Sequence, residues 1–70
     1  QFNLDVQVKQ AQDAQIVIFD MVGKNLYQKE VLLNRGENIV PVECNNLPTG
    51  VYHLSLISES EQRSLRLVIE

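Results

Sequence analysis

His53 is the only imidazole and Cys44 the only thiol in this sequence, so these two residues are the first candidates for catalysis or metal binding. A zinc site needs several ligands at suitable spacing, and no such set accompanies either residue. Cys44 follows Glu43, whose negative charge disfavours the thiolate that a nucleophile requires. The alternation of residues 51–57 places His53 on a solvent face. We therefore interpret His53 as a surface side chain and Cys44 as a packed, inert one.

The remaining composition argues against several further classes of function. Gly23, Gly36 and Gly50 stand in separate turns, so no glycine-rich loop is present to cradle a phosphate. Two Phe, two Tyr and no Trp are too few for a face that stacks on sugars or bases. A net charge of −3, with the cations scattered, gives no basic surface for nucleic acid. The sequence predicts a domain that is not an enzyme, with no metal ion, cofactor or nucleic-acid partner.

The length of 70 residues fits one domain with a small core. A single cysteine excludes an internal disulfide, and no apolar run approaches the ~20 residues of a membrane-spanning helix. Gln1 opens directly into a strand pattern instead of a starting Met or a signal peptide. We therefore expect residues 1–70 to be one domain at the C-terminal end of a longer protein.

Short strands separated by turn residues account for most of the chain. Phe2, Leu4, Val6 and Val8 alternate with polar residues, which predicts a strand with one buried face. Within residues 15–19, the four residues from Ile16 to Phe19 are apolar in succession and rich in β-branched side chains, as in a central strand covered on both faces. Further strands are predicted at residues 25–33, 38–44, 51–57 and 65–69. Polar connections are predicted at residues 10–14 and 58–62.

Two turns stand out because their residues suit defined backbone geometries. Asp20 and Gly23 occupy the first and fourth positions of a predicted type I turn, with Gly23 at the bulge that closes a three-residue hairpin. Met21 and Val22 at the tip are unusual, since polar residues are common there. They either fold back over the end of the domain or form a small exposed contact point.

The second turn is Leu47-Pro48-Thr49-Gly50, followed at once by Val51-Tyr52. Proline presets φ at the second position of a type I turn and glycine suits the fourth. Gly50, like Gly23, is predicted to serve backbone geometry, and alanine would cost stability where the φ of the glycine is positive. Tyr52 is interpreted as a core aromatic side chain whose hydroxyl lies at the rim.

These patterns predict an all-β fold, an immunoglobulin-like antiparallel β-sandwich of about six to seven short strands. Pro41 confines its strand to an edge or a bulge. An uncovered edge strand offers free N–H and C=O groups, so we expect a homodimer through strand edges. The residues expected to face mostly inward are Phe2, Leu4, Val6, Ile16, Ile18, Tyr52, Leu54, Leu56, Leu65 and Leu67.

The order of these motifs resembles the type A C-terminal sorting domain of proteins exported by the type IX secretion system, or Por system, of certain Gram-negative bacteria. Members of that family show an apolar strand ending in an Asp-any-any-Gly-basic turn, a later glycine turn, a Leu-Pro-any-Gly-Val-Tyr segment and a last Leu/Val strand. The resemblance covers roughly residues 15–70. One difference is the acidic Glu70, where family members commonly end on a basic residue.

The resemblance implies that the domain is an address for its cargo rather than a catalyst. The cargo, attached N-terminally, would cross the periplasm and be recognised by the outer-membrane translocon and its shuttle protein. A cysteine peptidase acting as a sortase would usually remove the domain and attach the cargo to lipopolysaccharide at the cell surface. The motif residues that the resemblance assigns to translocon recognition are Asp20, Gly23, Lys24, Leu47, Pro48, Gly50, Tyr52, Leu65, Arg66, Leu67, Val68, Ile69 and Glu70.

A structural or adhesive β-sandwich module of a large surface protein is the alternative interpretation. Both interpretations predict the same fold, so the strand pattern does not distinguish them. For the terminal strand we expect Leu65, Leu67 and Ile69 to anchor it in the core. Arg66 and Val68 would then point outward, where a partner can reach them.

Overall fold

The fold is known from a computed structural model that describes residues 2–59 and 61–70. Gln1 lies outside the described residues, and so does Ser60 in the predicted connection at 58–62. The regular elements are six strands: β1 (Phe2–Val8), β2 (Gln12–Phe19), β3 (Asn25–Leu33), β4 (Gly36–Val42), β5 (Gly50–Ser58) and β6 (Gln62–Ile69). The all-β prediction is confirmed.

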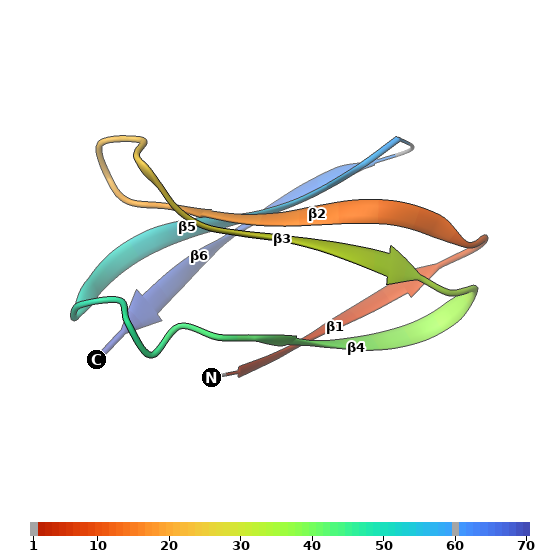
Figure 1. The fold of residues 1–70 in the computed structure, drawn as a ribbon, viewed down its shortest axis with the longest axis horizontal. Coiled ribbons are helices and arrows are strands. Elements are labelled where there is room, and N and C mark those ends of the chain that lie inside the picture. Colours follow the sequence, from red (N-terminus) through yellow and green to blue (C-terminus); the bar gives the residue numbers. More distant parts are fainter. Residues whose placement is uncertain (1, 60) are drawn as a thin grey trace.

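Two antiparallel sheets make up the fold. One contains β1 and β4, and the other has the order β3-β2-β5-β6 (Figure 1). Figure 1 shows the two-stranded sheet below the four-stranded sheet, extending to the end where β3 leads into β4. Pro41 lies in β4, which has only one neighbour, so its missing N–H removes no necessary ladder hydrogen bond. The predicted antiparallel β-sandwich is therefore confirmed, with six strands.

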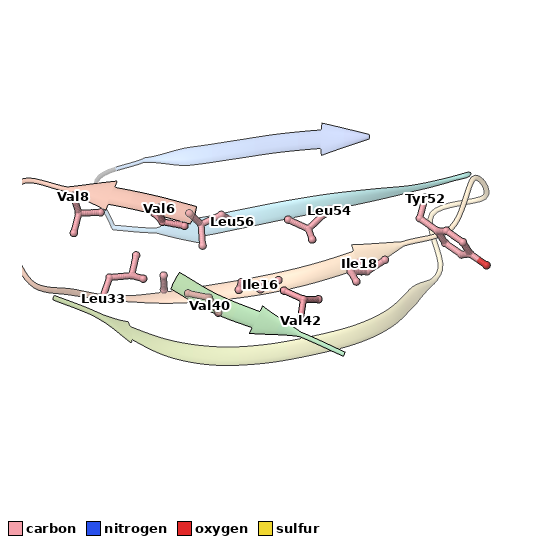
Figure 2. Packing of buried hydrophobic residues seen from close by; sticks show 11 residues of the cluster. Val6, Val8, Ile16, Ile18, Leu33, Val40, Val42, Tyr52, Leu54 and Leu56 are labelled. Carbon is pink, nitrogen blue, oxygen red and sulfur yellow. The ribbon is translucent and has the colours of Figure 1, made fainter. Parts of the chain in front are cut away.

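The core lies between the sheets and is centred on β2. Ile16, Val17 and Ile18 are all buried, as expected for a strand with neighbours on both sides. Figure 2 shows the inward side chains of both sheets in the space between them, with Tyr52 at one end. Each fully buried aliphatic side chain stabilises the fold by about 1.5–3 kcal/mol. The buried cluster contains Val6, Val8, Ala14, Ile16, Ile18, Leu33, Val40, Val42, Tyr52, Leu54 and Leu56.

Four strands begin earlier than the apolar patterns predicted, β5 by the single residue Gly50. β2 starts at Gln12, so the assignment of residues 12–14 to a connection was wrong. β4 starts at Gly36 and β6 at Gln62. Backbone pairing continues past the last apolar residue, because a ladder needs only N–H and C=O groups while polar side chains stay in water.

The terminal strand β6 is less buried than the sequence predicted. Leu65 pairs with the buried Leu54, so it faces the inner side of the sheet, yet it is 42% exposed. Leu65 lines an open recess of about 120 Å³ with Leu4, Leu54 and Arg63 among the other lining residues. A two-stranded sheet does not cover the whole width of a four-stranded one, and β6 is an edge strand. The prediction of Leu65 as a core anchor was wrong, whereas Leu67 and Ile69 are half-buried against the core.

The chain crosses between the sheets at residues 34–36, where Asn38 organises the connection. Its side-chain oxygen accepts a hydrogen bond from the Asn34 N–H at 2.9 Å, and its Nδ2 donates to the Asn34 carbonyl at 2.8 Å. The same Nδ2 lies 3.3 Å from the Val6 carbonyl on β1. Gly36 has a φ of 100°, which allows the reversal into β4.

Candidate recognition surface

The hairpin between β2 and β3 is fixed by the Asp20 side chain. Its Oδ1 accepts hydrogen bonds from the backbone N–H groups of Val22 at 3.0 Å and Lys24 at 2.8 Å. The Asp20 carbonyl accepts from the Gly23 N–H, and the Asp20 N–H donates to the Lys24 carbonyl. A carboxylate that accepts two N–H groups in this way defines a rigid turn. Asp20 therefore fixes the backbone conformation of the hairpin tip.

Gly23 performs the backbone role predicted for it. Its φ is 88°, in the left-handed region that favours glycine, and the β2–β3 register shifts between Ile18 and Phe19. The prediction of a hairpin closed by a glycine and a bulge is confirmed. Space around Gly23 is open, so the restraint on a side chain here is conformational rather than steric crowding.

The loop before β5 is held by Tyr52. The Tyr52 hydroxyl donates a hydrogen bond of 2.6 Å to the Pro48 carbonyl, while its ring is buried. Figure 2 shows this hydroxyl pointing away from the core at the end of the sandwich. The interpretation of Tyr52 as a core aromatic with its hydroxyl at the rim is confirmed.

Two details of this loop differ from the sequence analysis. Gly50 does not have a positive φ, because positive φ values occur only at Gly23 and Gly36 among the described glycines. The backbone turn hydrogen bond runs from the Leu47 N–H to the Cys44 carbonyl, three residues before the predicted turn. The hydrogen bond from the Tyr52 hydroxyl to the Pro48 carbonyl therefore holds this loop in place of the predicted Leu47–Gly50 backbone bond.

The end of the chain pairs with the start of β5. Ile69 pairs with Gly50, Leu67 with Tyr52 and Val68 with Val51. Residues directly opposite share a face, so Val68 and Val51 lie together on the outer face of the four-stranded sheet. Arg66 lies on that same face, opposite the exposed His53. The prediction that Arg66 and Val68 point outward is confirmed.

Three motifs far apart in the sequence meet at one end of the sandwich. The β2–β3 hairpin tip, the loop leading into β5 and the end of β6 lie at the same end in Figure 1. A shallow recess of about 330 Å³ is lined by Asp20, Met21, Val22, Gly50, Val51 and Tyr52. Leu65 lies further along β6, opposite Leu54, and is not part of this end.

Met21 and Val22 project from this end into solvent. Met21 is 65% exposed and Val22 is 88% exposed. The folded-back arrangement of this tip is therefore excluded, and both side chains are exposed. Nothing in the turn requires these residues, since Asp20 and Gly23 supply its geometry.

The two residues first considered for catalysis lie apart from any cluster of reactive groups. His53 is exposed on β5, as predicted, and Cys44 is half-buried in the loop after β4. Across residues 2–59 and 61–70, no group of three or more His, Cys, Asp and Glu side chains could hold a metal ion. The same part of the chain contains no helix long and apolar enough to cross a membrane.

The sequence analysis missed the interactions that join these motifs. The bond from Tyr52 to Pro48 was not predicted, although a tyrosine four residues after the proline of a turn is a visible signal for it. The contact between the hairpin tip and the start of β5 has no local signal, because residues 21 and 51 are brought together only by sheet pairing.

The fold and this surface together define a small antiparallel β-sandwich whose sequence motifs shape one end of the domain. A comparison with known protein families matches residues 1–70, the whole chain, to the secretion system C-terminal sorting domain. The chain belongs to this family of type IX secretion sorting domains. No curated protein and no solved structure matches it significantly. The family is that of a type IX sorting signal on an exported cargo protein, and it implies delivery to the cell surface or secretion.

Proposed function

We propose that this domain is read in the periplasm by the outer-membrane translocon and its shuttle protein. A sortase-like cysteine peptidase then removes the domain and joins the cargo to lipopolysaccharide. In this account the chain catalyses no step, because the peptidase supplies the nucleophile and the domain supplies only a folded surface.

The observation that carries the proposal is the meeting of the family's motifs at one end of the sandwich. Asp20, Gly23 and Lys24 form the hairpin, while residues 47–52 and 67–70 lie beside it. A folded domain presents residues distant in sequence as one surface, so a receptor can distinguish it from an unfolded chain end. The motif residues proposed to form or support this surface are Asp20, Gly23, Lys24, Leu47, Pro48, Gly50, Tyr52, Leu67, Val68, Ile69 and Glu70, with Arg66 beside them and Leu65 further along the strand.

An adhesive or spacing module is the second candidate. The free sides of the edge strands β3 and β6 favour it, because edge strands offer hydrogen-bonding groups to another chain. The family membership favours the export signal over this alternative.

The deciding experiment fuses residues 1–70 to a periplasmic reporter in a bacterium with a type IX system. A second fusion lacks residues 67–70, which removes Leu67 and Ile69 from the edge of the core. We expect the complete fusion to reach the cell surface and the shortened one to stay in the periplasm. The melting curve of each purified domain shows whether the shortened domain still folds.

A spacer or adhesive module makes a different prediction. For such a module, residues 67–70 would not direct either fusion to the surface. Equal surface delivery of the two fusions would also contradict a role for the terminal strand in recognition.

A further inference from the structure

The exposed side chains at the hairpin end have no structural explanation within the domain. The turn is fixed by the Asp20 carboxylate and by Gly23, and a type I turn accepts most residues between them. Met21 and Val22 nevertheless place two apolar side chains in water at the tip. Single exposed apolar residues are common on protein surfaces, whereas a contiguous exposed apolar patch marks a contact site.

The apolar character continues from the tip onto the neighbouring sheet. Val22 and Met21 line the same recess as Val51, and Val51 pairs with Val68 on the outer face. Val68 is 55% exposed. We name the four side chains Met21, Val22, Val51 and Val68 the tip patch.

Two cations flank the tip patch without an ion pair. Lys24 closes the hairpin and Arg66 precedes Val68 by two residues on the same face of β6. Neither makes an ion pair among the residues that the structure describes, where Arg63 pairs instead with Glu61. Both side chains are exposed, so an approaching carboxylate would meet no competing partner.

We propose that the motif residues build the hairpin end while the tip patch makes the contact with the export machinery. The contact partner is a protein with an apolar recess rimmed by acidic side chains, complementary to the tip patch and to Lys24 and Arg66. This inference rests on the proposed function, because it names the receptor chemistry of the same site. Met21 and Val22 act as preformed anchors. Because the Asp20 turn already fixes their backbone, binding costs little further conformational entropy there.

The size and the charge of the domain argue against other occupants. A stable interface takes about 20–30 residues from each partner, far more than the four side chains of the tip patch, so a second copy is a poor fit. The net charge of −3 repels an anionic lipid surface. A small apolar anchor with flanking cations suits a transient protein contact, as a cargo signal that must be released requires.

The test uses the reporter fusion with paired substitutions. Met21→Ser with Val22→Ser removes the tip, and Leu32→Ser with Ile39→Ser is the matched control, since Leu32 is 65% exposed and Ile39 is 63% exposed elsewhere on the domain. We expect the tip variant to lose surface delivery by about tenfold or more and the control to match the parent. All four positions are exposed, so the melting temperatures of both variants should equal that of the parent.

Charge reversal gives a second, independent comparison. Lys24→Glu with Arg66→Glu should reduce surface delivery, whereas Lys9→Glu with Arg35→Glu, which changes the net charge equally at other exposed cations, should not. This pair keeps the inference testable if the serine substitutions lower the melting temperature. Equal delivery of all four variants overturns the inference, while failure of the parent fusion itself overturns the proposed function.

Binding measurements on the purified domain test the two other occupants, a lipid surface and a second copy of this chain. Tip-dependent binding of the parent to vesicles of phosphatidylglycerol and phosphatidylethanolamine would replace the protein partner with a lipid surface. Tip-dependent dimerisation in sedimentation would replace it with a second copy. The result that supports a protein recess is a domain that shows neither tip-dependent vesicle binding nor tip-dependent dimerisation, combined with loss of delivery in the tip variant.

Discussion

The hydroxyl of Tyr52 donates a 2.6 Å hydrogen bond to the carbonyl of Pro48, four residues earlier in the chain. This bond joins the buried first part of β5 to the exposed loop before it. It gives a physical reason for a tyrosine in the Leu-Pro-any-Gly-Val-Tyr segment. Phenylalanine would fill the core equally well but could not donate the hydrogen bond that holds the loop. The Tyr52 hydroxyl therefore holds the loop at Pro48 against the start of β5.

Removing this hydroxyl should cost measurable stability. We expect Tyr52→Phe to lower the free energy of unfolding by about 1 kcal/mol, which shifts the melting temperature of a domain of this size by roughly 4–8 °C. Tyr27→Phe is the matched control, because the Tyr27 ring is half-buried and its hydroxyl makes no hydrogen bond within residues 2–59 and 61–70. Equal melting temperatures for the two variants would show that the Tyr52 bond contributes nothing.

The two hairpin-end glycines should respond differently to alanine. Gly23→Ala places a Cβ at a φ of 88° and should cost about 1 kcal/mol or more. At Gly50 the backbone lacks a positive φ, and a Cβ would meet the Tyr52 ring at an ordinary distance of 3.7 Å. We expect Gly50→Ala to be the milder change in thermal denaturation. A larger loss at Gly50 than at Gly23 would contradict the assigned backbone geometry.

How far the sequence predicts this molecule depends on whether a feature is local. The Asp20 and Gly23 hairpin was predicted, because turn geometry depends on four neighbouring residues. The burial of residues 16–18 was predicted from consecutive apolar side chains. These features need no knowledge of the partner strands.

Features that depend on how the strands and sheets are arranged were not predicted. Leu65 has the right period for a core position, but its exposure is set by the width of the β1–β4 sheet opposite. Gly50 was expected to serve the geometry of a turn, although it is already the first residue of β5 and pairs with Ile69. The meeting of the hairpin tip with Val51 also follows from strand order, which alternation of residues does not contain.

Two leucines that pair across β5 and β6 provide a direct test of this unequal burial. Leu54 is 1% exposed and Leu65 is 42% exposed. We expect Leu54→Ala to cost about 2–5 kcal/mol, a large share of the stability of a domain this small, and Leu65→Ala to cost under about 1 kcal/mol. Urea titration of both variants measures the difference. Similar losses would mean that the β1–β4 sheet covers β6 after all.

The outward side chains of β6 should matter for export and not for folding. Arg66→Ala with Val68→Ser changes two exposed positions, so the urea midpoint should stay within error of the parent. We expect the reporter fusion carrying this pair to reach the surface less efficiently. Gln62→Ala, an exposed position on the outer face at the other end of the same strand, is the control. Unchanged export of the Arg66 and Val68 variant would remove the outer face of β6 from the recognition surface.

The central claim is that this sandwich is by itself a sufficient export address. The most direct measurement is the fraction of a periplasmic reporter, fused to residues 1–70, that external protease can reach on intact cells. The comparison is between a host with a working type IX translocon and the same host without it. The account predicts surface reporter only in the first host and periplasmic reporter in the second. Reporter that remains periplasmic in both hosts would contradict it.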